Sequence, residues 1–176
     1  MKRPTPPIEW AGDHIRIIDQ TLLPAEVKFI EIRSASQAVD AIQRLAIRGA
    51  PALGAFGSLA LVVALDEIEP ESLSQARTRL EECRTLIGDA RPTAINLRWA
   101  VDRVIDQATK DGSDLTSLRS ALIREAQAVA DEDKAACDEI GRLGHELLRD
   151  ANVIGTHCNA GRLATAGSGT ALAPMY

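Results

Sequence analysis

The chain has 176 residues, of which 45% are hydrophobic, 26% are charged and 3% are aromatic, and its formal net charge is −5. This balance is typical of a globular protein with a core of its own and argues against disorder or collagen-like structure. A negative charge and so few aromatic side chains also argue against nucleic acid as a partner.

The three cysteines, Cys83, Cys137 and Cys158, are widely spaced and form no C-x-x-C pair. We therefore expect neither a disulfide framework nor a structural zinc site, and a cytoplasmic location fits best. The first residues lack the apolar stretch of a signal peptide. The longest uncharged run, 49–65, is too short and too interrupted to span a membrane, so we predict a buried core helix and no membrane partner.

Short runs of β-branched residues mark the N-terminal part of the chain. The runs 14–19 and 27–32 flank a segment that contains Pro24. This arrangement predicts a small antiparallel hairpin or meander. We expect the first dozen residues to form an ordered tail at most.

Helical periodicity follows the hairpin. Ser34 or Ser36 can cap a helix that runs to about Ile47, and Gly49 can end it. Pro51 suits the first turn of the buried helix that follows.

Three further helices are predicted downstream. One begins after Ser72 and another after Pro92, where Thr93 is a candidate cap. The pattern is helical almost throughout 114–150, although Gly141 and Gly144 allow a break or a close contact.

The period changes at Asn152. Residues 152–158 predict a strand, and a glycine-rich stretch follows, as at the start of an α/β ligand-binding crevice. A lone parallel strand has no neighbour to pair with. We therefore predict an α+β N-terminal domain (1–125), consisting of a small antiparallel sheet plus a helical bundle. A long connecting helix and the truncated start of a Rossmann-like domain would follow (126–176), leaving its strand and glycine-rich tail exposed.

Two arginines each precede a helix start. In Arg48-Gly49-Ala50-Pro51 and Arg91-Pro92-Thr93, a guanidinium lies beside the free N–H groups of a first turn. Such groups together can bind a phosphate or a carboxylate. Either arginine alone could equally be a surface or capping residue.

Cys158 is the cysteine with the most reactive setting. It would end the predicted strand, where the amides of the following turn can lower the pKa of a thiol and hold an anion. The alternative is a small buried residue, as we expect for Cys83 and Cys137. His157 is adjacent, but neighbours on a strand point to opposite faces, so no Cys/His pair is expected. The glycines match neither common nucleotide-binding motif.

Several segments in order resemble the methylthioribose-1-phosphate isomerase family of aldose–ketose isomerases. The wider superfamily includes the regulatory subunits of translation initiation factor two-B, and the cysteine-containing segment favours the isomerase branch. The matching segments are D-Q-T-L-L-P (19–24), I-R-G-A-P-A-L-G (47–54), R-P-T-A-I-N-L (91–97), T-H-C-N-A-G (156–161) and L-A-T-A-G (163–167).

The resemblance implies a role for each candidate residue. Arg48, Gly49, Ala50 and Arg91 would hold the substrate phosphate, and Cys158 would be catalytic. Its partner aspartate would lie in a C-terminal half outside this chain, so we expect the chain to be nearly inactive alone. No metal or organic cofactor is implied, and the partner would be a small sugar phosphate. Homodimerisation and association through the exposed second domain remain open.

Two other functions remain open. The chain could be a non-catalytic sugar-phosphate-binding or regulatory scaffold related to the initiation factor subunits. It could also be a thiol-dependent hydrolase that uses Cys158, although the sequence places no base beside that residue.

Overall fold

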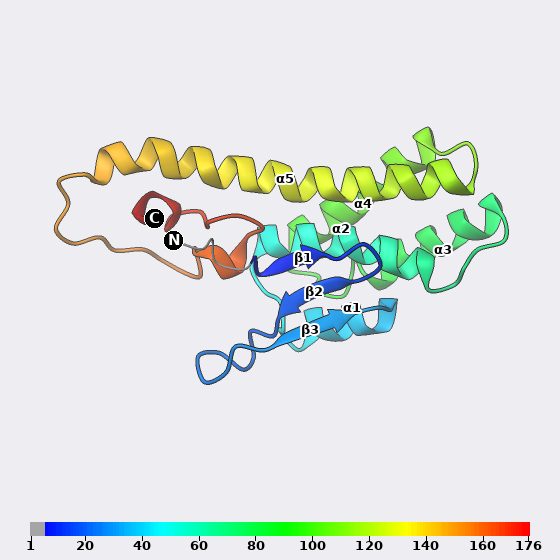
Figure 1. Cartoon of the computed structure of the whole chain (residues 1–176), viewed down its shortest axis with the longest axis horizontal. Coiled ribbons are helices and arrows are strands. Elements are labelled where there is room, and N and C mark those ends of the chain that lie inside the picture. Colours follow the sequence, from blue (N-terminus) through cyan, green and yellow to red (C-terminus); the bar gives the residue numbers. More distant parts are fainter. Residues whose placement is uncertain (1–5) are drawn as a thin grey trace.

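A three-stranded antiparallel sheet covers one side of the helices in the computed structural model, which describes residues 6–176 (Figure 1). The strands are β1 (Ile8–Trp10), β2 (Ile15–Ile18) and β3 (Phe29–Ile32), in the order β1-β2-β3. The predicted hairpin is confirmed as β2 and β3. Strand β1 was not predicted, because its three residues are too few to show a period of two.

Five helices follow the sheet. The buried helix predicted over 49–65 is confirmed as the central one, α2, because every residue from 52 to 65 is buried. A helix that is apolar on all sides is stable only when other elements surround it, and α2 packs against each of the other four. The five are α1 (Ala35–Gln43), α2 (Ala50–Asp66), α3 (Leu73–Leu86), α4 (Ile95–Asp111) and α5 (Leu115–Leu148).

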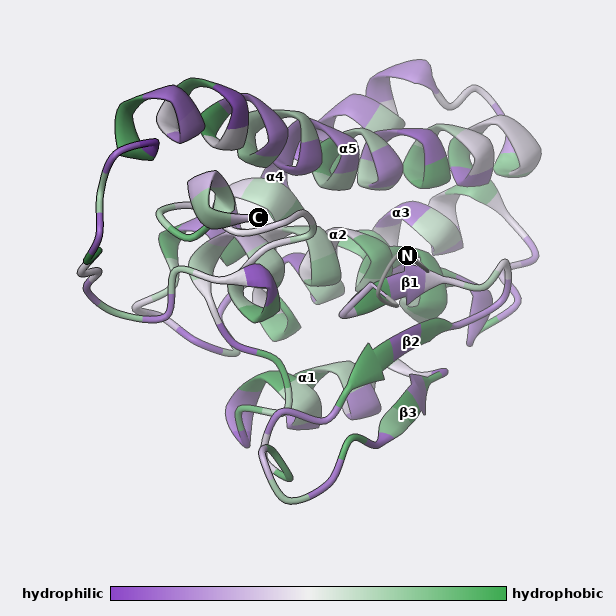
Figure 2. Ribbon diagram, turned by 60° about the vertical axis from the view of Figure 1, so that its left-hand side comes forward, coloured by the Kyte–Doolittle hydropathy of each residue, from purple (hydrophilic) through white to green (hydrophobic). Residues whose placement is uncertain are grey.

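Alternate residues of the sheet face this helical core. Ile15 and Ile17 of β2 are fully buried, and Ile32 of β3 pairs with Ile15 and is 2% exposed. The period of two in a strand places these side chains on one face. Figure 2 shows α2 coloured largely as hydrophobic, whereas α5 alternates between hydrophilic and hydrophobic residues. Among residues 6–176, no helix combines the length and apolar character needed to cross a membrane.

The helix starts were predicted with mixed success. The side chains of Ser34 and Ser72 accept hydrogen bonds from backbone amides of α1 and α3, so both are N-caps. The proposed cap at Thr93 is wrong, because α4 is preceded by Ala94 and has no side-chain cap. The amide of Ala94 instead donates to the carbonyl of Arg91, which closes a turn before the helix.

Helix α5 is continuous over 34 residues and is not broken at its glycines. Instead, the end of the chain packs against them. A Cβ atom added to Gly144 would lie 2.4 Å from Cγ of Pro174. The alternative of a close contact is therefore confirmed. The predicted domain boundary at 125/126 falls inside this helix and stays a prediction.

The strand predicted over 152–158 is wrong. Residues 151–159 form an exposed segment without regular structure, in which Val153 is 91% exposed. A parallel strand needs a neighbour for its backbone hydrogen bonds, and no other strand of the described chain lies beside this segment. The structure therefore does not confirm a Rossmann-like portion.

The glycine-rich tail is folded rather than exposed, which corrects a second expectation. Figure 1 shows the chain leaving the end of α5 in a wide loop and returning toward the start of α2. There it forms two 3₁₀ turns, η1 (Arg162–Ala164) and η2 (Ala173–Met175). Ala164, Thr165 and Ala173 are buried. Small residues allow this tail to pack closely on α2 and α5.

Candidate functional site

The start of α2 carries the R-G-A-P segment. Gly49 is the N-cap residue, with φ +100° and ψ 132°, and Pro51 lies in the first turn as predicted. No side chain caps this helix, so the amides of Ala50 and Ala52 in its first turn have no side-chain partner. The helix dipole adds a partial positive charge at this end. Arg48 directly precedes Gly49 and is exposed, so a cationic residue adjoins an uncapped helix start in the chain.

Segment 162–164 lies against this helix start. A Cβ atom added to Gly49 would fall 2.5 Å from Cα of Ala164 and 2.6 Å from its carbonyl oxygen. Only glycine permits so close an approach of two backbones. The L-A-T-A-G segment is thus in contact with the R-G-A-P segment, although more than 110 residues separate them in the sequence.

Gln20 joins three of the matching segments. Its Nε2 donates to the carbonyl of Leu163 at 2.8 Å, and its Oε1 accepts from Nε of Arg48 at 3.3 Å. Its backbone amide donates to the carbonyl of Ala46 at 2.9 Å. Gln20 is 3% exposed. Gln20 was not predicted as a site residue, although it lies in the D-Q-T-L-L-P segment.

The neighbouring carboxylate of Asp19 fixes the same segment. It accepts from Oγ1 and N of Thr21 at 2.6 and 3.1 Å and from Nη1 of Arg44 at 2.7 Å. Burial acts to raise the pKa of Asp19, but the hydrogen bonds from Thr21 and Arg44 outweigh it and hold the pKa below its ordinary value. Asp19 therefore holds the backbone beside Gln20 in place as an ionised group.

The segment around Arg91 lies beside the same part of α2. A Cβ atom added to Gly54 would be 3.2 Å from the carbonyl oxygen of Asn96, in the first turn of α4. The half-buried Arg91 comes just before this turn. The first turn of α4 therefore packs against α2 at Gly54, which lies about one helical turn after the beginning of α2.

Cys158 is the exposed cysteine of the three, whereas Cys83 and Cys137 are buried. Its φ of +66° is unusual for a residue with a side chain. It lies in the loop before η1 rather than at a strand end, and His157 is exposed as well. Burial raises the pKa of the Cys83 thiol to about 11, which fits an inert core residue. The interpretation of Cys83 and Cys137 as buried helix residues is confirmed.

A carboxylate on α5 anchors the other side of the tail. Asp133 accepts a 2.6 Å hydrogen bond from the amide of Ala166 and a further one from the amide of Gly167. Burial raises the pKa of Asp133, and the two amide bonds offset part of that rise. A Cβ atom added to Gly167 would lie 2.9 Å from Cβ of Cys137. The sequence pattern did not single out Asp133 as part of a site.

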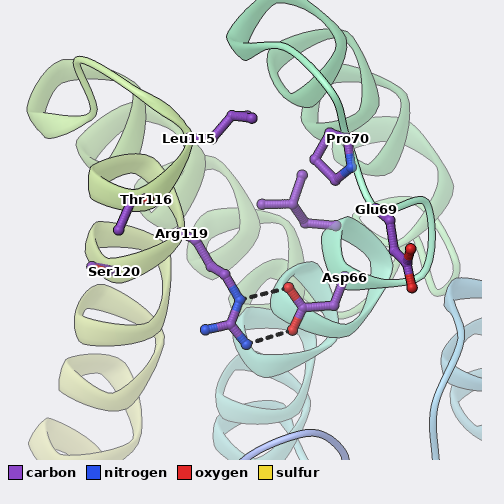
Figure 3. Close-up of a pocket in the computed structure, with 8 residues that line it drawn as sticks. Asp66, Glu69, Pro70, Leu115, Thr116, Arg119 and Ser120 are labelled. Carbon is purple, nitrogen blue, oxygen red and sulfur yellow. Dashed lines mark hydrogen bonds and ion pairs between the residues drawn. The ribbon is translucent and has the colours of Figure 1, made fainter.

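A groove of about 530 Å³ lies at the opposite end of α2, against the start of α5. Arg119 donates from Nε and Nη2 to the two carboxylate oxygens of Asp66, each at 2.7 Å, across this groove (Figure 3). It contains none of the predicted site residues. Within residues 6–176, no three His, Cys, Asp or Glu side chains are grouped to hold a metal ion.

The small sheet, the buried central helix and the long α5 together define the N-terminal domain of initiation factor two-B-like proteins. Residues 46–173 match the family model described as the Initiation factor 2 subunit family, and the chain belongs to this family.

Curated relatives cover the whole chain. A 5-deoxyribose 1-phosphate isomerase of Moorella thermoacetica is 42% identical over 100% of this chain and 50% of its own length. A methylthioribose-1-phosphate isomerase of Gemmatimonas aurantiaca is 43% identical over 97% of this chain and 50% of its own length. The chain thus spans about half the length of these relatives.

Two crystal structures have the same fold. The translation initiation factor eIF-2B subunit delta from A. fulgidus is 38% identical, with a TM-score of 0.89 over 98% of this chain and 50% of its own. The 5-methylthioribose 1-phosphate isomerase from Pyrococcus horikoshii is 31% identical, with a TM-score of 0.87 over 98% of this chain and 48% of its own.

Proposed function

We propose that the chain forms the phosphate-binding part of an aldose–ketose isomerase that acts on S-methyl-5-thioribose 1-phosphate. The observation that carries this proposal is the uncapped start of α2, where Arg48 and the amides following Gly49 occur together. An arginine beside free helix amides is a site for a phosphate. The relatives named as isomerases of 1-phosphorylated sugars support a sugar phosphate as the ligand.

The proposed chemistry explains why the phosphate needs a fixed position. Because C1 of the substrate carries the phosphate on its oxygen, the ring cannot open as that of a free aldose does. The ring oxygen must gain a proton as its bond to C1 breaks. The hydrogen on C2 moves to C1, and the C2 hydroxyl gives up its proton and becomes the carbonyl of the ketose, so the phosphate stays on the C1 oxygen throughout. These transfers need an acid/base pair held close to C1 and C2. Arg48, Arg91 and the amides of Gly49 and Ala50 would hold the adjacent phosphate.

Cys158 is the proposed member of the acid/base pair within this chain. Its thiol is exposed in the loop before η1, so it is accessible to a ligand. Its proposed partner, an aspartate, belongs to the half of the relatives that this chain does not span. Loss of one acid/base group reduces rates by about 10²–10⁴-fold. We therefore propose that the isolated chain binds the sugar phosphate and turns it over very slowly.

Calorimetric titration with methylthioribose 1-phosphate tests the proposed site. We expect Arg48→Met to weaken binding about 10–100-fold, as loss of charge-assisted hydrogen bonds does. Arg142→Met is the matched control, because Arg142 is exposed on α5 and pairs with Glu139. Equal affinity in wild type and Arg48→Met would refute the site. Turnover by the wild-type chain that Cys158→Ala abolishes would refute the need for a group outside the chain.

A second candidate is a non-catalytic regulatory scaffold. The observation that favours it is the likeness to the eIF-2B subunit delta structure, which has the higher identity of the two crystal structures. This candidate predicts no turnover of methylthioribose 1-phosphate even when a C-terminal half is added. It also predicts stable association with other subunits of an initiation-factor-type assembly that Cys158→Ala leaves unchanged.

A further inference from the structure

The amide of Gln20 has one permitted orientation. The carbonyl of Leu163 can only accept a hydrogen bond, so the NH₂ group of Gln20 must face it. The amide oxygen must then face Nε of Arg48, which can only donate. Because Gln20 is 3% exposed, water cannot readily replace either partner. The two contacts therefore reinforce each other.

The contact with Gln20 orients the guanidinium of Arg48. Its Nε–H is engaged by Oε1 of Gln20, which fixes one edge of the planar group. The two Nη groups carry the other four N–H donors of the guanidinium, which Gln20 does not engage. A long arginine side chain otherwise loses considerable rotamer freedom when it binds a ligand. An arginine that is already held loses less of it and binds more tightly.

We propose that Gln20 is the positioning residue that orients Arg48, and that the same side chain ties segment 162–164 to the start of α2. The importance of the orientation rests on the proposed function, in which Arg48 holds the phosphate. The orientation itself rests on the two hydrogen bonds of Gln20 alone. The close approach of Gly49 and Ala164 at the same place gives segment 162–164 a defined position.

Two variants separate the contacts of Gln20. Gln20→Met keeps the length of the side chain but removes both hydrogen bonds. Gln20→Glu keeps an acceptor for Arg48 but places a carboxylate oxygen against the carbonyl of Leu163, which cannot donate to it. Gln107→Met is the matched control, because Nε2 of Gln107 makes a single hydrogen bond, to Asp111, outside the site.

The readouts are the water-exchange rates of the Arg48 Nε–H and the Ala164 amide proton, measured by NMR without ligand. We expect the Arg48 rate to rise about tenfold in Gln20→Met and to stay low in Gln20→Glu. The Ala164 rate should rise in both Gln20 variants. Gln107→Met should leave both the Arg48 rate and the Ala164 rate unchanged. A purely structural role predicts that both variants change the Arg48 rate equally, and that result would overturn the proposal. An unchanged Arg48 rate in Gln20→Met would overturn it too.

Binding then connects this result to function. We expect the affinity for methylthioribose 1-phosphate to fall about 5–10-fold in Gln20→Met and to be unchanged in Gln107→Met. Absence of binding by the wild-type chain would refute the proposed function, whereas the exchange rates would still decide the role of Gln20. If Gln20→Met does not fold, Gln20→Glu decides the proposal alone. A fast Arg48 proton with a protected Ala164 amide in that variant would contradict it.

Discussion

Gly49→Ala tests the contact between the start of α2 and the returning tail. The added Cβ would lie 2.5 Å from Cα of Ala164, whereas carbon atoms in contact are about 3.5–4.0 Å apart. Alanine has no rotamer that relieves this overlap, and Cα belongs to the backbone, so the tail itself must move. Overpacking of this kind costs about 1–3 kcal/mol. The φ of +100° adds a conformational cost of about 1–3 kcal/mol for a residue with a side chain.

Two other glycines separate these contributions. Gly12 has nearly the same φ, +101°, but an added Cβ meets nothing within 4 Å, so Gly12→Ala measures the conformational cost alone. Gly155 has neither a positive φ nor a neighbour within 4 Å, so Gly155→Ala should change the free energy of unfolding by less than about 0.5 kcal/mol. The effect of alanine on the unfolded chain is common to all three variants and cancels.

Urea unfolding and amide hydrogen exchange provide the measurements. We expect Gly49→Ala to lower the free energy of unfolding by about 1–3 kcal/mol more than Gly12→Ala. Exchange at the Ala164 amide, which donates to the carbonyl of Gly161, should increase in Gly49→Ala and stay unchanged in Gly12→Ala. Equal destabilisation with an unchanged Ala164 amide would refute the docked position of the tail.

Three further predictions concern stability. Ser72→Ala should lower the free energy of unfolding, measured by thermal unfolding, by about 1 kcal/mol because it removes the N-cap of α3. Ser74 is exposed on the same helix, so Ser74→Ala should leave this free energy unchanged. Phe56→Ala should cost about 3–5 kcal/mol in urea, since this side chain is fully buried; a cost below 1 kcal/mol would contradict that burial. The pKa of Asp19 is lowered on folding, so its contribution is present above its unfolded pKa of about 3.8 and is lost as the pH falls through the folded value. Asp19→Asn should therefore destabilise the chain by about 1–3 kcal/mol at pH 7, and the difference from wild type should shrink below pH 3.8.

Local signals predicted much of the fold. The two β-branched runs gave the hairpin because strand propensity and the proline-containing connection act within a few residues. Ser34, Ser72 and Pro51 identified helix starts because capping is local chemistry. Thr93 failed as a cap because its segment forms a turn closed by the Ala94 amide instead.

Long-range packing explains the errors. Residues 152–158 have strand-like composition, but a strand needs a pairing partner that composition cannot reveal. The glycines and alanines of the tail suggested an open ligand crevice, whereas their small size serves close packing against Gly49 and Cys137.

For the candidate site, the sequence could indicate only the local features. It pointed to Arg48 and Gly49 through their position before a helix, and α2 begins directly after them; their role stays a prediction. The hydrogen bonds of Gln20 could not be foreseen, because the Leu163 carbonyl lies 143 residues away in the sequence. The same holds for Asp133, whose partner amide at Ala166 lies 33 residues away.

NMR titration of the chain with methylthioribose 1-phosphate tests the central claim most directly. The account predicts saturable shifts of the backbone amides of Gly49, Ala50 and Ala52 and of the side-chain Nε–H groups of Arg48 and Arg91. In Arg48→Met, about 10–100-fold more ligand should be needed for the same backbone shifts, and the rest of the spectrum should be unaltered. Shifts confined to the groove around Asp66 and Arg119, or no shifts at ligand concentrations in the millimolar range, would contradict it.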